Sequence, residues 1–131
     1  MKARTTIGAV LLALATTAAA GDANYTRMRA LAERDEATVP AAESEAFVTR
    51  QGEVAGKAVM ACFDASNPPK RISLAVVMEL GADGRVVRTW RRDDDRLTAC
   101  VAGMLAGQHM WTPPQAPFYS FVQMDLDVKA E

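Results

Sequence analysis

The alternation of apolar and polar positions is clearest in the middle of the chain. Residues 72–80 read Ile-Ser-Leu-Ala-Val-Val-Met-Glu-Leu, so every second residue is a large apolar one. This period of two predicts a β-strand with one buried face. A Gly-Ala-Asp-Gly segment follows at 81–84, and residues 85–90 predict a second strand. Together these segments predict a β-hairpin.

The length of the hairpin loop decides which side chains face the core. A three-residue loop pairs Leu80 with Val86 and Val76 with Trp90, and it places Arg88 on the apolar face. A two- or four-residue loop would instead exchange the two faces of the second strand, because a slip of one residue turns every side chain over. The sequence leaves this choice open.

Two segments with helical periodicity flank the hairpin. Residues 45–64 carry apolar and small side chains on one face and charged side chains on the other, which predicts an amphipathic helix. Residues 93–106 predict a second helix, with Asp93 or Asp94 as its N-cap. An alternating segment at 118–128 predicts a third strand.

The order helix, strand, strand, helix, strand predicts an α+β fold. We expect an αββαβ arrangement, in which a three-stranded antiparallel sheet carries both helices on one face. A right-handed crossover through the second helix would place the third strand beside the first. The expected strand order is therefore 2-1-3.

Residues 1–20 have the three-part layout of a secretory signal peptide. Lys2 and Arg4 precede an apolar run, and small residues follow up to Ala20. A signal anchor is the alternative, but the apolar run is shorter than the ~20 residues that span a bilayer. We therefore expect cleavage near Ala20, a periplasmic or secreted protein, and no stable membrane insertion after cleavage.

The rest of the chain predicts one domain, at 43–131, preceded by a polar arm at 21–42. The arm has few apolar residues, of which Tyr25, Met28 and Leu31 follow a weak helical spacing within a charged stretch. We expect this arm to be mobile and dispensable for folding.

Charge and cysteine content narrow the class of protein. The formal net charge of the chain is −1, and loss of Lys2 and Arg4 makes it −3, which argues against nucleic acid as a partner. A small exported domain benefits from a covalent cross-link. The two cysteines, Cys62 and Cys100, both lie on apolar helix faces, and we expect them to form a disulfide. Free reactive thiols are the alternative.

Several of these features together resemble a known family. The chain has a cysteine near the end of its first helix, a strand that ends in Leu80-Gly-Ala-Asp-Gly84, a Cys100-Val101 pair in its second helix, and Trp111-Thr-Pro-Pro114 before its last strand. In this order they resemble the TonB C-terminal-like domains, and among them the two-cysteine AgmX/PglI-type C-terminal domain. The resemblance implies a non-catalytic module of the cell envelope that binds an extracytoplasmic protein or peptide.

The resemblance also implies a place for the partner. A last strand at the sheet edge can accept an extended peptide as an added strand. Tyr119, Phe121 and Gln123 are then the candidate contacts with the partner, and Asp125 and Asp127 are expected to guard the edge against self-association.

Two alternative functions stay open. The first is a small secreted hydrolase or enzyme inhibitor. Because His109 is the only histidine and no nucleophile, phosphate-binding or metal-binding motif accompanies it, we expect no catalytic activity, metal or cofactor. The second is a binder of an anionic envelope ligand, which would use four arginines of the hairpin. These are Arg85, Arg88, Arg91 and Arg92.

Overall fold

The computed structural model describes residues 20–129, so residues 1–19 of the predicted signal peptide lie outside the described residues. The described part contains three helices and three strands. They are α1 (Ala20–Glu36), α2 (Ala41–Cys62), β1 (Arg71–Leu80), β2 (Val86–Arg91), α3 (Arg96–Leu105) and β3 (Phe118–Asp127). Within this part of the chain no helix has both the length and the apolar character needed to cross a bilayer.

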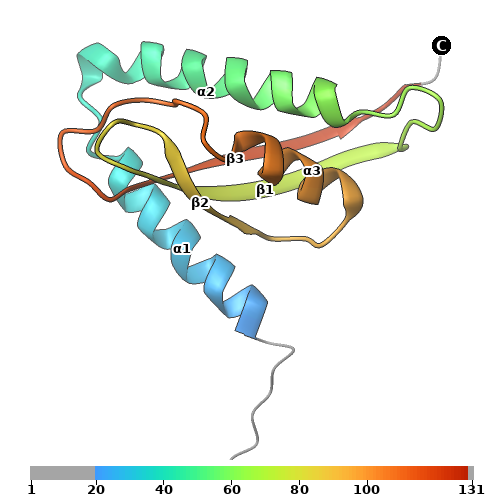
Figure 1. The fold of residues 1–131 in the computed structure, drawn as a ribbon, viewed down its shortest axis with the longest axis horizontal. Coiled ribbons are helices and arrows are strands. Elements are labelled where there is room, and N and C mark those ends of the chain that lie inside the picture. Colours follow the sequence, from blue (N-terminus) through green and yellow to red (C-terminus); the bar gives the residue numbers. More distant parts are fainter. Residues whose placement is uncertain (1–19, 130–131) are drawn as a thin grey trace, which may run out of the picture.

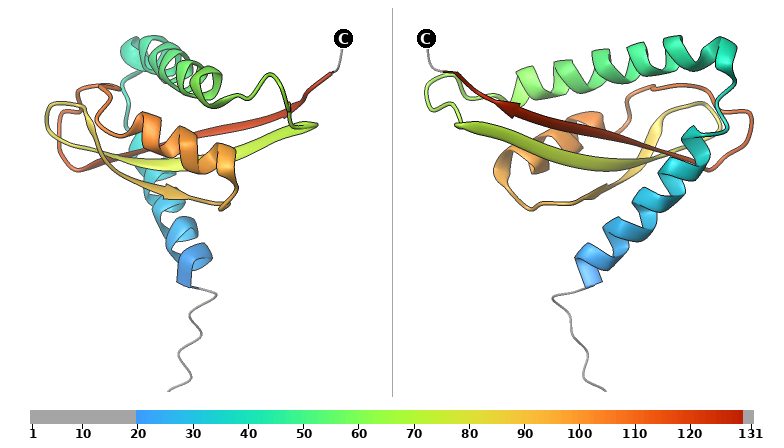
Figure 2. Two further views of the ribbon diagram at one scale, coloured as in Figure 1. Left: turned by 45° about the vertical axis from the view of Figure 1, so that its right-hand side comes forward. Right: turned by 180° about the vertical axis from the view of Figure 1, so that it is seen from behind.

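The three strands form one antiparallel sheet in the order β2-β1-β3. This order confirms the strand order predicted from the sequence, and the elements confirm the α+β class. α2 and α3 lie over one face of the sheet, and α1 crosses the opposite face (Figures 1 and 2). The sheet is therefore covered by helices on both sides, whereas the sequence pattern predicted helices on one side only.

The main core lies between the sheet and the pair α2 and α3. The even-numbered residues of β1 point into it, as the period of two predicts, and they pack against apolar side chains of both helices and of β3. The fully or almost fully buried members from the strands are Ile72, Leu74, Val76, Met78, Leu80, Val86, Phe118 and Val122.

A second, smaller core lies under α1. Tyr25, Met28 and Ala32 are buried against Ala75 and Val77 on the other face of β1. The expectation of a mobile arm at 21–42 is therefore wrong: its residues up to Glu36 form the packed helix α1, and its last two residues begin α2. A narrow apolar stripe is enough to hold α1 on the sheet, because the small Ala32 and Ala75 side chains let the helix approach the sheet closely.

The hairpin register agrees with the sequence at the turn and departs from it further along. Leu80 lies opposite Val86, as a three-residue loop predicts. A β-bulge next to this pair then shifts β2 by one residue, so that Trp90 lies opposite Val77. Trp90 therefore packs in the second core, and Arg88, which lies over its ring, is exposed on the α1 side. The predicted place of Arg88 on the main apolar face is wrong.

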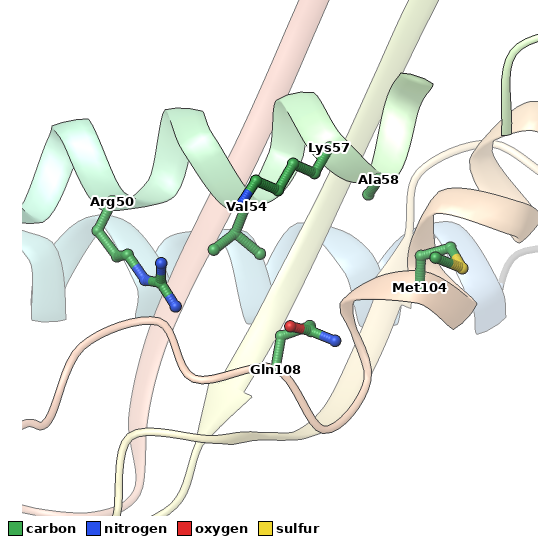
Figure 3. A pocket seen from close by; sticks show the side chains of 6 residues that line it. All are labelled: Arg50, Val54, Lys57, Ala58, Met104 and Gln108. Atoms are coloured by element: carbon green, nitrogen blue, oxygen red, sulfur yellow. The ribbon is translucent and has the colours of Figure 1, made fainter. Parts of the chain in front are cut away.

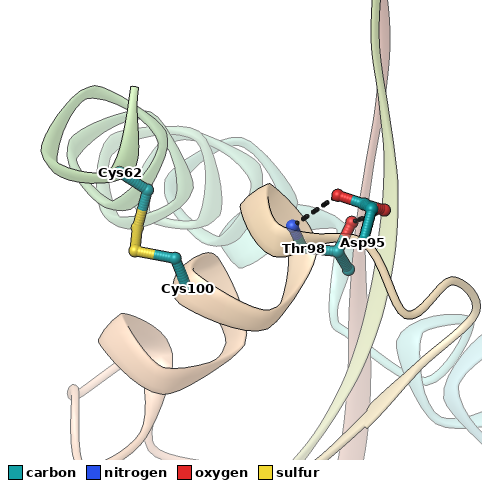
Figure 4. Close-up of a disulfide and its surroundings, with 4 residues drawn as sticks. All are labelled: Cys62, Asp95, Thr98 and Cys100. Carbon is teal, nitrogen blue, oxygen red and sulfur yellow. Dashed lines mark hydrogen bonds between the residues drawn. A yellow bond between two sulfur atoms is a disulfide. The ribbon is translucent and has the colours of Figure 1, made fainter. Parts of the chain in front are cut away.

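The start of α3 is fixed by Asp95. Its carboxylate accepts hydrogen bonds from the Thr98 N–H at 2.9 Å and from the Thr98 hydroxyl at 2.7 Å (Figure 4). The predicted N-caps, Asp93 and Asp94, are wrong by one or two residues. Both instead form ion pairs with arginines that precede them in the chain.

Cys62 and Cys100 form a disulfide, which confirms the prediction. It joins the last residue of α2 to the middle of α3, with the two Cα atoms 5.8 Å apart (Figure 4). The cross-link closes a segment with a sequence separation of 38 that contains the whole hairpin. By chain entropy, such a loop contributes roughly 3–4.5 kcal/mol to stability.

Candidate functional site

The outer edge of β3 is where the family resemblance predicts that a partner peptide binds. The Val128 N–H donates to the Lys70 carbonyl at 2.9 Å, so the even-numbered residues of β3 are those that exchange hydrogen bonds with β1. The N–H and C=O groups of the odd-numbered residues point away from the sheet. These residues are Tyr119, Phe121, Gln123, Asp125 and Asp127.

Side chains from α1 and α2 already occupy the first half of this edge. The Tyr119 N–H donates to Asp35 Oδ2 at 2.9 Å, and the Phe121 N–H donates to Glu36 Oε2 at 3.3 Å. Gln51 Nε2 donates to the Phe121 carbonyl at 3.2 Å. No further strand can pair with these groups unless α1 moves away.

Glu36 is the carboxylate with the most perturbed environment at this edge. Burial between α1, α2 and β3 raises its pKa from 4.5 to about 7, because a desolvated carboxylate is harder to ionise. Hydrogen bonds from the Phe121 N–H and the Ser120 hydroxyl, the nearby Gln51 amide and the positive charge of Arg29 favour the ionised form, but they do not offset the burial.

The second half of the β3 edge is open. No strand lies beyond β3 in the described sheet, and the side-chain hydrogen bonds to its outward backbone groups stop at Phe121. Among residues 20–129, no protein group therefore pairs with the outward N–H and C=O groups of Gln123 and Asp125. Unpaired edge groups of this kind are a template for another extended chain.

A groove runs beside this open edge, under α2. In the view from behind in Figure 2, β3 is the nearest strand and α2 passes above it in the same direction. The groove has a volume of about 380 Å³ and a largely apolar lining, and Glu36 lies at its α1 end. Its lining residues from the two walls are Val48, Gln51, Gly52 and Ala55 of α2 and Phe121, Val122, Gln123 and Met124 of β3.

The residues predicted to contact a partner are placed unequally. Tyr119 and Phe121 turn their rings toward α1, where the Arg29 guanidinium lies 3.4 Å from the centre of the Phe121 ring. Their rings are therefore partly covered. Gln123 is exposed at the edge, and its side-chain oxygen accepts a hydrogen bond from Arg29 at 2.8 Å. Of the three, only Gln123 lies where the edge is open.

The four hairpin arginines do not gather into one cationic patch. Arg85 lies next to the turn, whereas Arg91 and Arg92 lie at the far end of β2. Three of them form ion pairs with nearby aspartates, namely Arg85 with Asp83, Arg91 with Asp94 and Arg92 with Asp93. Arg88 lies over the Trp90 ring instead. This arrangement neutralises most of the charge that an anionic ligand would need.

A second hollow lies between α2 and the segment that follows α3 (Figure 3). Its volume is about 200 Å³, and Arg50 projects over it. The Arg50 guanidinium donates two hydrogen bonds to the His109 carbonyl, at 3.0 and 3.2 Å, so this arginine holds the loop in place. The His109 ring nitrogen Nε2 lies 3.0 Å from the Thr112 hydroxyl.

Several residues of the edge were not found by sequence reasoning. Asp35, Glu36 and Gln51 cap β3, although the sequence placed the first two in a mobile arm. One signal was present, since Asp35 and Glu36 both lie in the last turn of α1, where the helix dipole disfavours carboxylates. Acidic residues in that position indicate partners outside the helix.

Comparison of the chain with family models, with curated proteins and with solved structures finds no match. The resemblance to TonB C-terminal-like domains therefore stays a prediction from the sequence. Among the described residues, no group of three or more His, Cys, Asp or Glu side chains is arranged to hold a metal ion.

Proposed function

We propose that the protein is an exported, non-catalytic binding module that captures an extended peptide segment of an extracytoplasmic partner by strand addition at the second half of β3. The observation that supports this most is the open backbone edge at Gln123 and Asp125, directly beside an apolar groove. The edge supplies main-chain hydrogen bonds, and the groove accepts alternate side chains of the added strand.

The geometry limits how much of the peptide is bound. An added strand would lie about 4.8 Å beyond β3 and begin after Phe121, because Asp35 and Glu36 block the edge before that point. About four backbone hydrogen bonds at ~1 kcal/mol each, and one or two buried apolar side chains at ~1.5–3 kcal/mol each, favour binding, but the cost of association cancels much of this gain. We expect weak binding, with a dissociation constant no lower than the micromolar range.

The disulfide supports the exported setting of this proposal. Disulfides persist in oxidising compartments such as the periplasm, and the Cys62–Cys100 bond is part of this fold. The family resemblance points to the same setting and to the same use of the last strand. The anionic-ligand alternative has less support, because three of its four arginines are paired with aspartates.

The proposal is tested by selecting binders from a phage library of random heptapeptides and mapping the bound peptide by amide chemical shifts. We expect the largest shifts at residues 122–127 and on the groove side of α2. Shifts confined to residues 85–92 would contradict strand addition and favour the anionic-ligand alternative.

A pair of glycine variants sharpens this test. Gly52 lines the groove, and a Cβ added there meets no atom within 4 Å. Gly52→Leu should therefore fold normally, fill the groove and weaken peptide binding at least tenfold. Gly103 in α3 is equally open to a Cβ, so Gly103→Leu is the matched control and should leave binding unchanged. Equal binding by both variants would exclude the groove from the binding site.

A further inference from the structure

The end of the groove next to α1 carries a carboxylate that the added strand would meet. We propose that Glu36 is a specificity-determining residue that selects a cationic side chain, so that the preferred peptides carry Lys or Arg at the position nearest α1. This inference rests on the proposed strand addition, and it names the chemistry of the peptide that the edge accepts.

Glu36 is placed to meet the first side chain of the peptide. Its carboxylate lies at the point where the capped part of the edge ends, because Oε2 accepts the Phe121 N–H. The next outward backbone groups, those of Gln123, are open, and Glu36 and Gln123 both line the groove. A long cationic side chain at the α1 end of an added strand would therefore reach Glu36.

Glu36 also lacks a cationic partner of its own among the described residues. No Lys or Arg nitrogen of residues 20–129 forms an ion pair with its carboxylate. Arg29 acts on it from a distance, since its guanidinium lies over the Phe121 ring and also bonds Glu33 and the Gln123 side chain. The remaining groups that face Glu36 are neutral donors, from Gln51 on α2 and Ser120 on β3.

The shifted titration of Glu36 makes the proposed selection depend on pH. With a pKa of about 7, the carboxylate is mostly neutral at pH 6 and mostly ionised at pH 8. A cationic side chain stabilises only the ionised form, so its binding would release a proton and tighten as pH rises. The expected gain between pH 6 and pH 8 is up to about tenfold in affinity.

The other charged side chains along the open edge of β3 are also carboxylates. The exposed carboxylates of Asp125 and Asp127 follow along β3 on the α1 side of the sheet. An added strand would place alternate side chains opposite them and the others in the apolar groove. Charge complementarity therefore favours a peptide in which apolar and basic residues alternate.

The test uses three synthetic heptapeptides, acetylated and amidated at their ends, in which Val alternates with Lys, Thr or Glu. Their affinities are measured by fluorescence anisotropy at pH 6 and pH 8. For the unmodified protein we expect the Lys peptide to bind tightest, by about tenfold over the Thr peptide at pH 8, with most of this advantage lost at pH 6. Glu36→Gln should remove the pH dependence and reduce the advantage at pH 8 to the part that Asp125 and Asp127 supply, and it should leave the Thr peptide unaffected.

Glu45→Gln is the matched control for net charge, because Glu45 is an exposed carboxylate of α2 that lines a different hollow. It should preserve the selection. Binding of none of the peptides would count against strand addition itself. Equal binding of all three, or a Lys preference in a folded Glu36→Gln variant that is as large and as pH-dependent as in the unmodified protein, would leave strand addition standing and overturn the role of Glu36.

Discussion

Glu36 combines two unfavourable conditions for a carboxylate, burial and a place at the C-terminal end of a helix. Because its pKa is higher in the folded protein than in the unfolded chain, the folded state binds more protons between about pH 4.5 and pH 7. This contribution to stability is complete below pH 4.5 and is lost as pH rises through 7. We expect the free energy of unfolding to fall by roughly 1–2 kcal/mol from pH 5 to pH 8, since partial solvent exposure screens the carboxylate.

Urea unfolding at several pH values measures this effect. In Glu36→Gln the decline between pH 5 and pH 8 should disappear, because the amide keeps the size of the side chain and can still accept the Phe121 N–H. Glu45→Gln should retain the decline. The same slope in all three proteins would mean that Glu36 does not titrate in this range.

At the residue scale, the sequence predicts what a local pattern determines. Cys62 and Cys100 each belong to an amphipathic segment, and two such segments over one small sheet must lie close together, which predicts the pairing; Cys100 itself is exposed, beside the buried face of α3. The caps of β3 could not be predicted in this way. Asp35 and Glu36 accept backbone N–H groups of β3 only because α1 packs against that strand. Nothing in their local sequence indicates that β3 is their partner.

The element least well predicted is α1. Its polar composition hides a buried stripe of only a few residues, of which Ala32 is fully buried but small enough to pass as neutral in a hydrophobicity pattern. The sequence also contained a sign of the second core in β1. Ala75 and Val77 are apolar residues at positions where the alternating pattern calls for polar ones, and both are buried under α1. An apolar residue on the supposedly solvent side of a strand indicates a second covering layer.

A chain that begins at Ala41 tests this element. It lacks α1, so Ala75, Val77 and Phe121 lose their cover, and the outward N–H groups of β3 lose their caps. We expect a loss of at least 3 kcal/mol in the free energy of unfolding, from apolar burial of ~25 cal/mol/Å² over several side chains. Urea unfolding and the binding of a hydrophobic dye report the two effects. An unchanged midpoint would restore the prediction of a dispensable arm.

The disulfide joins α2 directly to α3, which are otherwise connected only through the hairpin between them. Cys100→Ala should lower the free energy of unfolding by about 2–5 kcal/mol, the usual range for small exported domains. Reduction of the unmodified protein should produce a similar loss. Mass spectrometry of peptides cut without reduction checks the pairing. Free thiols after export, or a disulfide between two chains, would contradict it.

At the scale of the whole molecule, the strand order follows from the sequence but the groove does not. The order β2-β1-β3 results from a hairpin and one crossover past β1, and the sequence predicts both from short-range patterns and the usual rules for strand connections. The groove requires α2 to pass beside β3 and α1 to block one end of it, which depends on the packing of three elements distant in the chain. This is why the sequence indicated the edge strand but assigned its contacts to Tyr119 and Phe121.

An open edge also invites pairing between two copies of the molecule, and the last prediction concerns this. If two β3 edges paired antiparallel around Asp125, the two Asp125 side chains would face each other and each Gln123 would face an Asp127. Like charges directly opposite each other destabilise a strand pair by up to about 1 kcal/mol. We therefore expect the unmodified protein to be monomeric at 100 μM, on the order of the concentration used in sedimentation equilibrium.

Removing the charges should reverse this result. The double variant Asp125→Thr and Asp127→Thr keeps polar side chains with a high strand propensity and should self-associate about tenfold more strongly. Asp93→Thr and Asp94→Thr make the same change in net charge away from the edge and should stay monomeric, which separates edge pairing from lost repulsion between whole molecules. If both double variants associate equally, net charge alone keeps the copies apart. If neither does, the charges of Asp125 and Asp127 are not what keeps the two β3 edges apart.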